Sequence, residues 1–171
     1  MKSHNGMRPQ DIVVLLKVLK IPEPNWQYRD VAIALKLSLS EISESLQRSH
    51  IAGLIDDTKK KVYRENLMEF IEHGLHYVFP VLPGTMVTGI PTAHSHPFFK
   101  KKFKAEFQYV WDADKGDERG LAITPLYKNV AEAVLIDETL YLLLAAIDIY
   151  RVGRVRELKV AKEVLEQHIL S

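Results

Sequence analysis

The chain has 171 residues, of which 47% are hydrophobic and 26% charged, and its net charge is +1. This balance is typical of a globular protein and excludes the strong basic excess common in nucleic-acid-binding proteins, so any DNA contact must rest on local patches. Cysteine is absent, which excludes disulfides and cysteine-ligated metal centres, and no apolar run is long enough for a membrane span. Because the first residues carry no hydrophobic signal region, we expect a cytoplasmic protein.

The first helical pattern begins at Pro9 and is followed by a second after a proline-rich break. Pro9 and Asp11 suit the first turn of a helix, and apolar residues then recur at helical spacing until Pro22. A second helix is expected from about Tyr28 to Leu35. Two short helices are therefore expected before residue 36.

A third helix has the clearest start signal in the chain. Ser38 is a favourable N-cap, and Glu41 three residues later completes a capping box. This helix should run to about Ala52, where Gly53 can end it. Apolar pairs on either side of the charged segment 56–61 then predict a small hairpin, and a fourth helix is expected over Glu65 to Tyr77.

The order of helix, helix, turn, helix, hairpin and helix is that of a winged helix. Residues 37–55 resemble the recognition-helix signature of MarR-like winged helix-turn-helix transcriptional regulators. The matching positions are Leu37-Ser38, Ile42, Ser43, Leu46 and Gly53-Leu54-Ile55. The resemblance covers Arg8 to Tyr77 and implies sequence-specific DNA binding, with the third helix in the major groove and the charged hairpin as the wing.

The DNA-contacting residues expected on this basis are polar side chains of the third helix and cations of the hairpin. Serine and glutamine can bond base edges, glutamate can accept from cytosine, and lysine can neutralise phosphates. The expected set is Ser38, Ser40, Glu41, Ser43, Glu44, Gln47, Arg48, Lys59, Lys60, Lys61 and Arg64. An alternative stays open, because two glutamates on a reading face repel phosphate: the winged helix then serves as a protein-interaction adaptor or an antitoxin-like partner.

The remainder of the chain divides into an extended part and a helical part. Residues 79–124 are rich in Pro, Gly and Thr and predict an extended connector with possible short strands, whereas residues 125–171 predict helices. With residues 1–78 as the winged helix-turn-helix domain, the fold class expected is mainly α (α+β).

The helix expected over 137–150 is apolar almost all round and must therefore be buried. We expect it to contact a second copy, since DNA-binding regulators are usually symmetric dimers, although burial inside this chain is the alternative. The residues expected at the dimer contact are Leu140, Leu143, Leu144 and Ile147.

Three further clusters have a functional and a structural interpretation. His94 and His96, with His73 and His76 upstream, could bind a metal but supply too few converging ligands, so no metal and no cofactor are expected. The lysines of 100–104 lie among phenylalanines and could contact nucleic acid, but a solvated cluster over buried rings is favoured. The acidic loop 112–118 lacks the closing glutamate of a calcium loop.

The start of the last helix carries Arg151, Arg154, Arg156 and Lys159. These suit either a basic helix face near DNA or an acidic partner or, as favoured, intrahelical pairs with glutamates. No sequence motif of an enzyme is present. We therefore expect no catalytic residue, and we expect double-stranded DNA and a second copy, or a protein, as partners.

Overall fold

The computed structural model describes residues 6–22, 24–152 and 155–171 and has a mixed α/β (α+β) architecture. The first half contains α1 (Pro9–Lys20), α2 (Tyr28–Leu35), α3 (Leu39–Ile51), α4 (Arg64–His73) and α5 (Leu75–Val78). The second half contains β1 (Met86–Pro91), the 3-10 turn η1 (Ala93–Ser95), α6 (Pro97–Lys100), β2 (Tyr109–Asp112), β3 (Glu118–Ala122), α7 (Val130–Val134), α8 (Glu138–Val152) and α9 (Val155–Ile169). No helix of the described ranges has the length and apolar character needed to cross a membrane.

The turn between α2 and α3 is built from local signals. Lys36 ends α2 in the left-handed conformation, at a φ of 57°, and Leu37 is buried beneath the turn. Ser38 then caps α3, as its sequence position predicts. These contacts fix the angle at which α3 leaves α2, and α3 packs against both α1 and α2.

Two features of the first half differ from the sequence-based expectation. The helix expected over residues 65–77 is two helices, because Gly74 separates α4 from α5. The expected hairpin forms only one antiparallel bridge, between Ile55 and Val62. Asp56 instead closes a tight loop, accepting the backbone N–H groups of Lys60 and Lys61 at 3.0 Å.

The connector is more ordered than expected, since it contains a three-stranded sheet. β1 pairs antiparallel with both β2 and β3, and β2 pairs parallel with β3, so each strand has two neighbours. This closure needs close backbone approach at Gly89, where a Cβ would overlap the carbonyl of Trp111. Gly116 lies against the backbone of Gly89, and a Cβ at Gly116 would overlap that backbone.

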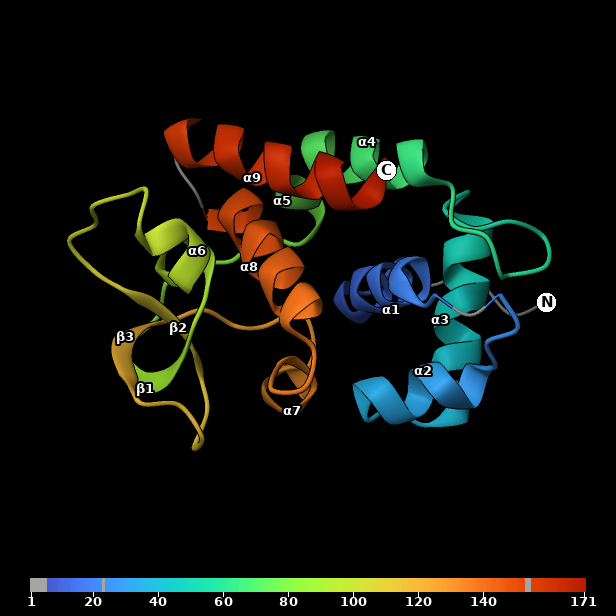
Figure 1. Ribbon diagram of the computed structural model, residues 1–171, viewed down its shortest axis with the longest axis horizontal. Helices are drawn as coiled ribbons and strands as arrows, with labels where there is room; N and C mark the ends of the chain where they lie inside the picture. Colours follow the sequence, from blue (N-terminus) through green and yellow to red (C-terminus); the bar gives the residue numbers. More distant parts are fainter. Residues whose placement is uncertain (1–5, 23, 153–154) are drawn as a thin grey trace.

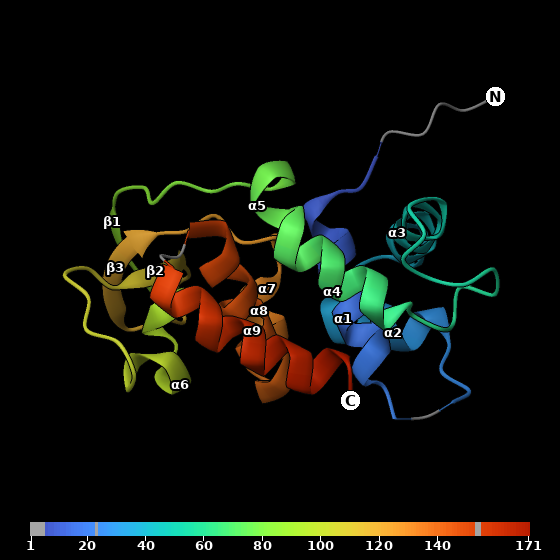
Figure 2. The same cartoon turned by 90° about the horizontal axis from the view of Figure 1, so that it is seen from above.

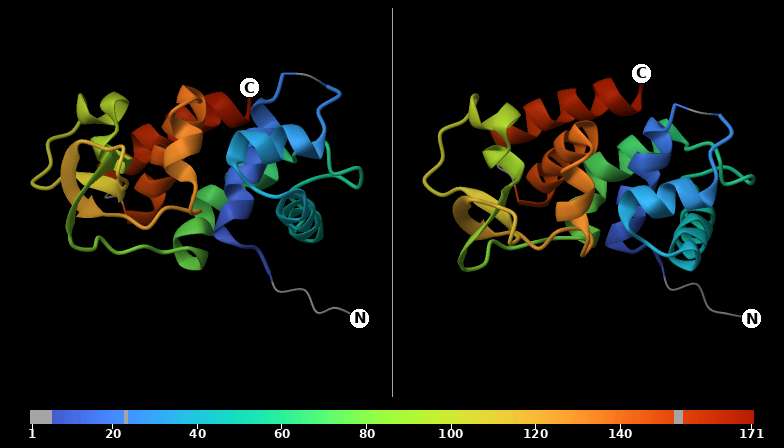
Figure 3. Two further views of the ribbon diagram at one scale, coloured as in Figure 1. Left: turned by 90° about the horizontal axis from the view of Figure 1, so that it is seen from below. Right: turned by 60° about the horizontal axis from the view of Figure 1, so that its bottom comes forward.

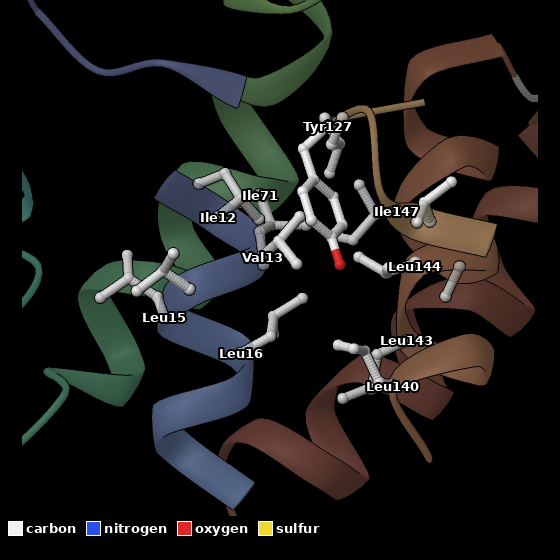
Figure 4. Packing of buried hydrophobic residues seen from close by; sticks show 14 of the residues in the cluster. Ile12, Val13, Leu15, Leu16, Ile71, Tyr127, Leu140, Leu143, Leu144 and Ile147 are labelled. Atoms are coloured by element: carbon white, nitrogen blue, oxygen red, sulfur yellow. The ribbon is translucent and has the colours of Figure 1, made fainter. Parts of the chain in front are cut away.

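The main core lies between α1 and α8 and corrects the expected dimer contact. Figure 4 shows Leu140, Leu143, Leu144 and Ile147 of α8 facing α1. All four are at most 3% exposed within the single chain. They are therefore covered by the chain's own helices and leave no side-chain surface for a second copy, because α8 is enclosed by α1, α4, α5, α7 and α9.

The molecule is elongated, with α2 and α3 at one end and the small sheet at the other (Figure 1). α9 runs across the middle and lies beside α4, as Figure 2 shows from above. The views in Figure 3 show α7 between α8 and α2, so the two ends are joined by packed helices. One hydrophobic cluster includes residues of all three expected segments.

Candidate nucleic-acid interface

α3 lies at the periphery of the molecule (Figure 2), and its side chains form one buried and one exposed face. Ile42 and Leu46 are fully buried against the neighbouring helices. The opposite face carries Ser40, Ser43, Glu44 and Gln47, all of which are exposed. The structure therefore keeps these four expected residues together on one free helix face.

Ser38 and Glu41 have a structural task at the start of this helix. The Ser38 hydroxyl accepts the Glu41 backbone N–H at 3.1 Å, and the Glu41 carboxylate accepts the Ser38 backbone N–H at 2.8 Å. Hydrogen bonding from the Ser38 backbone, with a smaller contribution from the charge of Lys128, lowers the pKa of Glu41. The Glu41 carboxylate is thus held at the cap, and its charge is partly offset by a lysine.

Arg48 does not lie on the exposed face, which corrects the expectation for this residue. It is 8% exposed, and its guanidinium donates two hydrogen bonds of 2.8 Å to the carboxylate of Asp11 on α1. The hydrogen bond to Asp11 raises the pKa of Arg48. The bidentate pair joins α3 to α1, so Arg48 is used by the fold and is not free to contact DNA.

The expected wing cations are only partly available. Lys60 donates to the Trp26 carbonyl at 2.6 Å and lies over the indole ring, 3.9 Å from its centroid. Arg64 donates to the carbonyls of Ile169 and Ser171 at 2.9 and 2.7 Å, so it binds the C-terminal end of α9. Lys59 is partly exposed and Lys61 is exposed. Lys60, Lys61 and Arg64 line one surface pocket, but Arg48 is buried elsewhere, so the five expected cations do not form one patch.

Two lysines that the sequence analysis missed lie near the start of α3. Lys36 is exposed at the left-handed turn, and its carbonyl accepts a 2.7 Å hydrogen bond from the side chain of Asn129. This bond brings the segment before α7 against the turn, and the exposed Lys128 influences the pKa of Glu41 from there. Lys128 is 87 residues from Glu41 in sequence, so no local pattern could have indicated it.

A second polar region lies at the far side of α8 and was also missed. Asp148 is 1% exposed and accepts hydrogen bonds from Thr92, from the Trp111 indole and from Arg151, at 2.7, 2.7 and 2.9 Å. Arg151 in turn donates to the carbonyls of Phe79 and Thr124. Burial raises the pKa of Asp148, whereas the charge of Arg151 and the donated hydrogen bonds act in the opposite direction. This cluster fastens the connector to α8.

The histidines do not converge. His94 contacts the carbonyl of Phe107 at 2.9 Å, whereas His96 packs against Tyr141, and His76 contacts the carbonyl of Arg151 at 3.1 Å. Within the part of the chain that the structure describes, no group of three or more potential metal ligands is present.

The remaining charged clusters belong to the sheet end of the molecule. Lys100 pairs with Glu118 at 3.1 Å, Lys102 lies over the exposed ring of Phe98, and Phe99 is fully buried. Arg156 donates to the carbonyl of Lys104 at 2.9 Å, while Arg154 lies outside the described residues. The lysine cluster is thus at the opposite end from α3 and is not continuous with it (Figure 1).

Comparison with known proteins identifies no relative. The chain matches no protein-family model, no curated protein and no solved structure. The functional argument therefore rests on the residues and their geometry.

Proposed function

We propose that the chain is a DNA-binding transcriptional regulator of the winged helix-turn-helix class and that α3 enters the major groove. The observation that carries the proposal is the free face of α3, which directly follows a capped turn and presents Ser40, Ser43 and Gln47. Hydroxyl and amide groups at the start of a recognition helix are the groups that contact base edges.

The charges that support the proposal are those of two lysines near this face, whereas Arg48 and Arg64 are held by contacts within the fold. Lys36 and Lys128 are positioned beside the start of α3, where the phosphates that flank a major groove would lie. The negative charge of Glu41 is offset by its cap and by Lys128, and that of Glu44 lies close enough to Arg48 to raise the pKa of the arginine after the larger effect of Asp11. Glu41 therefore has a nearby cation, whereas the charge of Arg48 beside Glu44 is already paired with Asp11.

A homodimer is part of the proposal, with an interface other than the buried face of α8. Two symmetric copies of α3 would read half-sites about one helical turn, roughly 34 Å, apart. Selection from a random duplex library at about 0.15 M salt, followed by sequencing, tests this directly. Enrichment of a two-fold symmetric site supports the regulator, and a flat profile at both high and low salt contradicts DNA binding.

Lysine substitutions make the test specific to this surface. Lys128→Ala should weaken binding to the enriched site and reduce the slope of log affinity against log salt concentration by about 0.9 for each lost phosphate contact. Lys36→Asn should act in the same way, because asparagine tolerates the left-handed turn. Lys115→Ala, an exposed lysine at the sheet end, removes the same charge and should leave both quantities unchanged.

A protein-interaction adaptor is the second candidate, and exposed apolar side chains favour it. Leu39 and Ile51, at the two ends of α3, are 56% and 53% exposed, and Ile33 on α2 is 67% exposed. The library selection separates the two functions, since an adaptor retains no duplex above background.

A further inference from the structure

A groove on the sheet side of α8 has the features of a small-molecule site, and it lies apart from the proposed DNA surface. It is formed by the start of α6 and the first turns of α8 and has a volume of about 430 Å³. Its lining includes His96, Phe98, Glu138, Thr139, Tyr141 and Leu142. Ligand pockets in proteins commonly have volumes of about 300–1,000 Å³ and combine apolar walls with a few polar groups.

His96 supplies a hydrogen-bond donor that the fold leaves unused. The ring is 8% exposed, and its Nδ1 accepts the Phe98 backbone N–H at 3.1 Å. Burial lowers the pKa of His96 to about 4, so the ring is neutral at pH 7 and carries its proton on Nε2. Among the described residues, none accepts this proton in a hydrogen bond. Nε2 is not among the buried side-chain atoms that lack a partner, so it reaches the open groove, where an acceptor on a ligand can replace water.

The aromatic walls around this donor are held in place. The rings of His96 and Tyr141 lie 4.2 Å apart between centroids, and the Tyr141 hydroxyl donates to the Pro91 carbonyl at 2.6 Å. On the other side, the ring of Phe98 is 40% exposed and rests edge-on against Phe99. A planar group entering the groove would therefore meet fixed aromatic surfaces, which lowers the entropy cost of binding.

The segment that carries His96 is itself rigid. Ala93 adopts a φ of 53°, a conformation that is uncommon for a residue with a side chain and that persists only where the surroundings enforce it. The enforcing contacts are the hydrogen bond from Thr92 to Asp148 and the bond from the Tyr109 backbone to Ser95. The position of the unused donor is thus set by the core.

The rim of the groove supplies acceptors. Glu138 is exposed at the start of α8 and carries a negative charge, and Thr139 adds a hydroxyl beside it. A planar ligand that contacts both groups must offer, from its edge, an acceptor to His96 and a donor to Glu138. A nucleobase with a ring nitrogen next to an exocyclic amino group, as in adenine and cytosine, has this combination.

We propose that the groove between α6 and α8 binds an amino-bearing nucleobase, whose ring nitrogen accepts from His96 Nε2 and whose amino group donates to Glu138. This site goes beyond the proposed function, because free nucleoside binding at α8 needs no duplex and no contact with α3.

Calorimetric titration of the full chain with adenosine and with cytidine tests the proposal. At least one should bind with a Kd on the order of 1 mM or tighter. N6,N6-dimethyladenosine, whose amino group cannot donate, should bind at least about tenfold more weakly than adenosine if adenosine is the ligand. Absence of heat with both nucleosides overturns the proposal.

Two substitutions assign the binding to this groove. His96→Asn keeps an acceptor for the Phe98 N–H but removes the Nε2 donor, and it should weaken binding about tenfold. Glu138→Ala removes the rim acceptor at an exposed position, so its effect is readable even if the His96 variant fails to fold. Glu163→Ala, an exposed glutamate on α9, is the matched control and should bind as the unsubstituted chain does. Binding that survives Glu138→Ala unchanged contradicts the proposed pose.

Discussion

At the scale of single residues, buried polar side chains differ in whether the fold supplies all of their hydrogen-bond partners. The Arg48 guanidinium on α3 donates two hydrogen bonds to the Asp11 carboxylate on α1. Arg48, which the sequence analysis assigns to the DNA-contacting face, therefore belongs to the core. His96 is the contrasting case, since its ring is equally buried and keeps one donor unused. Tyr127 is a third case, because its buried hydroxyl has no hydrogen-bond partner among the described residues.

Removing the partner of Asp11 should be strongly destabilising. Arg48→Met leaves a fully buried carboxylate without its guanidinium, which should lower the free energy of unfolding by about 3–5 kcal/mol. Urea denaturation followed by circular dichroism measures the loss. The double variant Arg48→Met with Asp11→Asn should regain part of it, and a single variant as stable as the unsubstituted chain would contradict the structural role.

Tyr127→Phe should stabilise the protein by about 1 kcal/mol, because it removes an unsatisfied hydroxyl from the apolar core between α1 and α8. Figure 4 shows this hydroxyl among the side chains of the two helices. Tyr141→Phe is the matched control: its hydroxyl donates to Pro91, so the same deletion should cost about 1 kcal/mol. Thermal unfolding of both variants distinguishes them, and equal changes would show that the Tyr127 hydroxyl has a partner.

The titration of His96 predicts a fall in stability on acidification. The pKa in the unfolded chain is about 6.5, and burial lowers it to about 4 in the folded chain. As the pH falls from 6.5 to 4, the unfolded state therefore binds a proton that the folded state does not, and the free energy of unfolding should drop by at most about 3 kcal/mol. Denaturation at several pH values should show a shallower slope for His96→Asn than for the unsubstituted chain, and an equal slope would contradict the prediction.

At the scale of secondary-structure elements, the caps and glycines determine where helices and strands can meet. Ser38 and Glu41 fix the start of α3, and Lys36 in the left-handed conformation ends α2 just before it. In the sheet, Gly89 permits each strand to contact the other two. The candidate interface depends on the cap formed by Ser38 and Glu41, because this cap sets the direction of the free face of α3.

Ser38→Ala should lower the free energy of unfolding by about 0.5–2 kcal/mol, because the Glu41 backbone N–H loses its acceptor. Ser38→Asp restores an acceptor at the same position and should recover most of the loss. Chemical denaturation gives the energies, and amide hydrogen exchange at residues 39–41 reports whether the first turn frays. Equal stability of the alanine and aspartate variants would argue against the cap.

At the scale of the whole molecule, the two ends are coupled through the core between α1 and α8. Lys17 on α1 also forms a 2.7 Å ion pair with Asp137, which accepts the Leu140 backbone N–H at the start of α8. Burial acts to raise the pKa of Asp137, but these donors outweigh it and lower the pKa. The first half of the chain and α8 should therefore unfold together.

Leu144→Ala should cost about 2–5 kcal/mol and lower the stability of both ends, since the side chain is 2% exposed in the shared core. Amide exchange of α3 and of the sheet should increase in parallel. Light scattering should give the same mass before and after the substitution, because Leu144 is covered within its own chain. A change of mass would mean that α8 does contact a second copy.

Local signals predicted much of the first half and little of the candidate sites. The third helix and its cap follow from Ser38 and Glu41, whose interaction spans three residues. Arg48 could not be placed, because its partner lies 37 residues away on another helix. The position of Lys128 near α3 and the groove around His96 likewise depend on contacts between distant segments, and hydrophobic periodicity does not predict such contacts.

The sequence by itself determined the positions of the main helices, the cap of α3 and the burial of α8, because these depend on residues within a few turns of one another. Only the tertiary structure decided what covers α8, which cations stay free beside α3 and which donor remains unused beside α8. Burial and ion pairing join residues far apart in the chain, so the same arginine or leucine serves the core or a partner according to what packs against it.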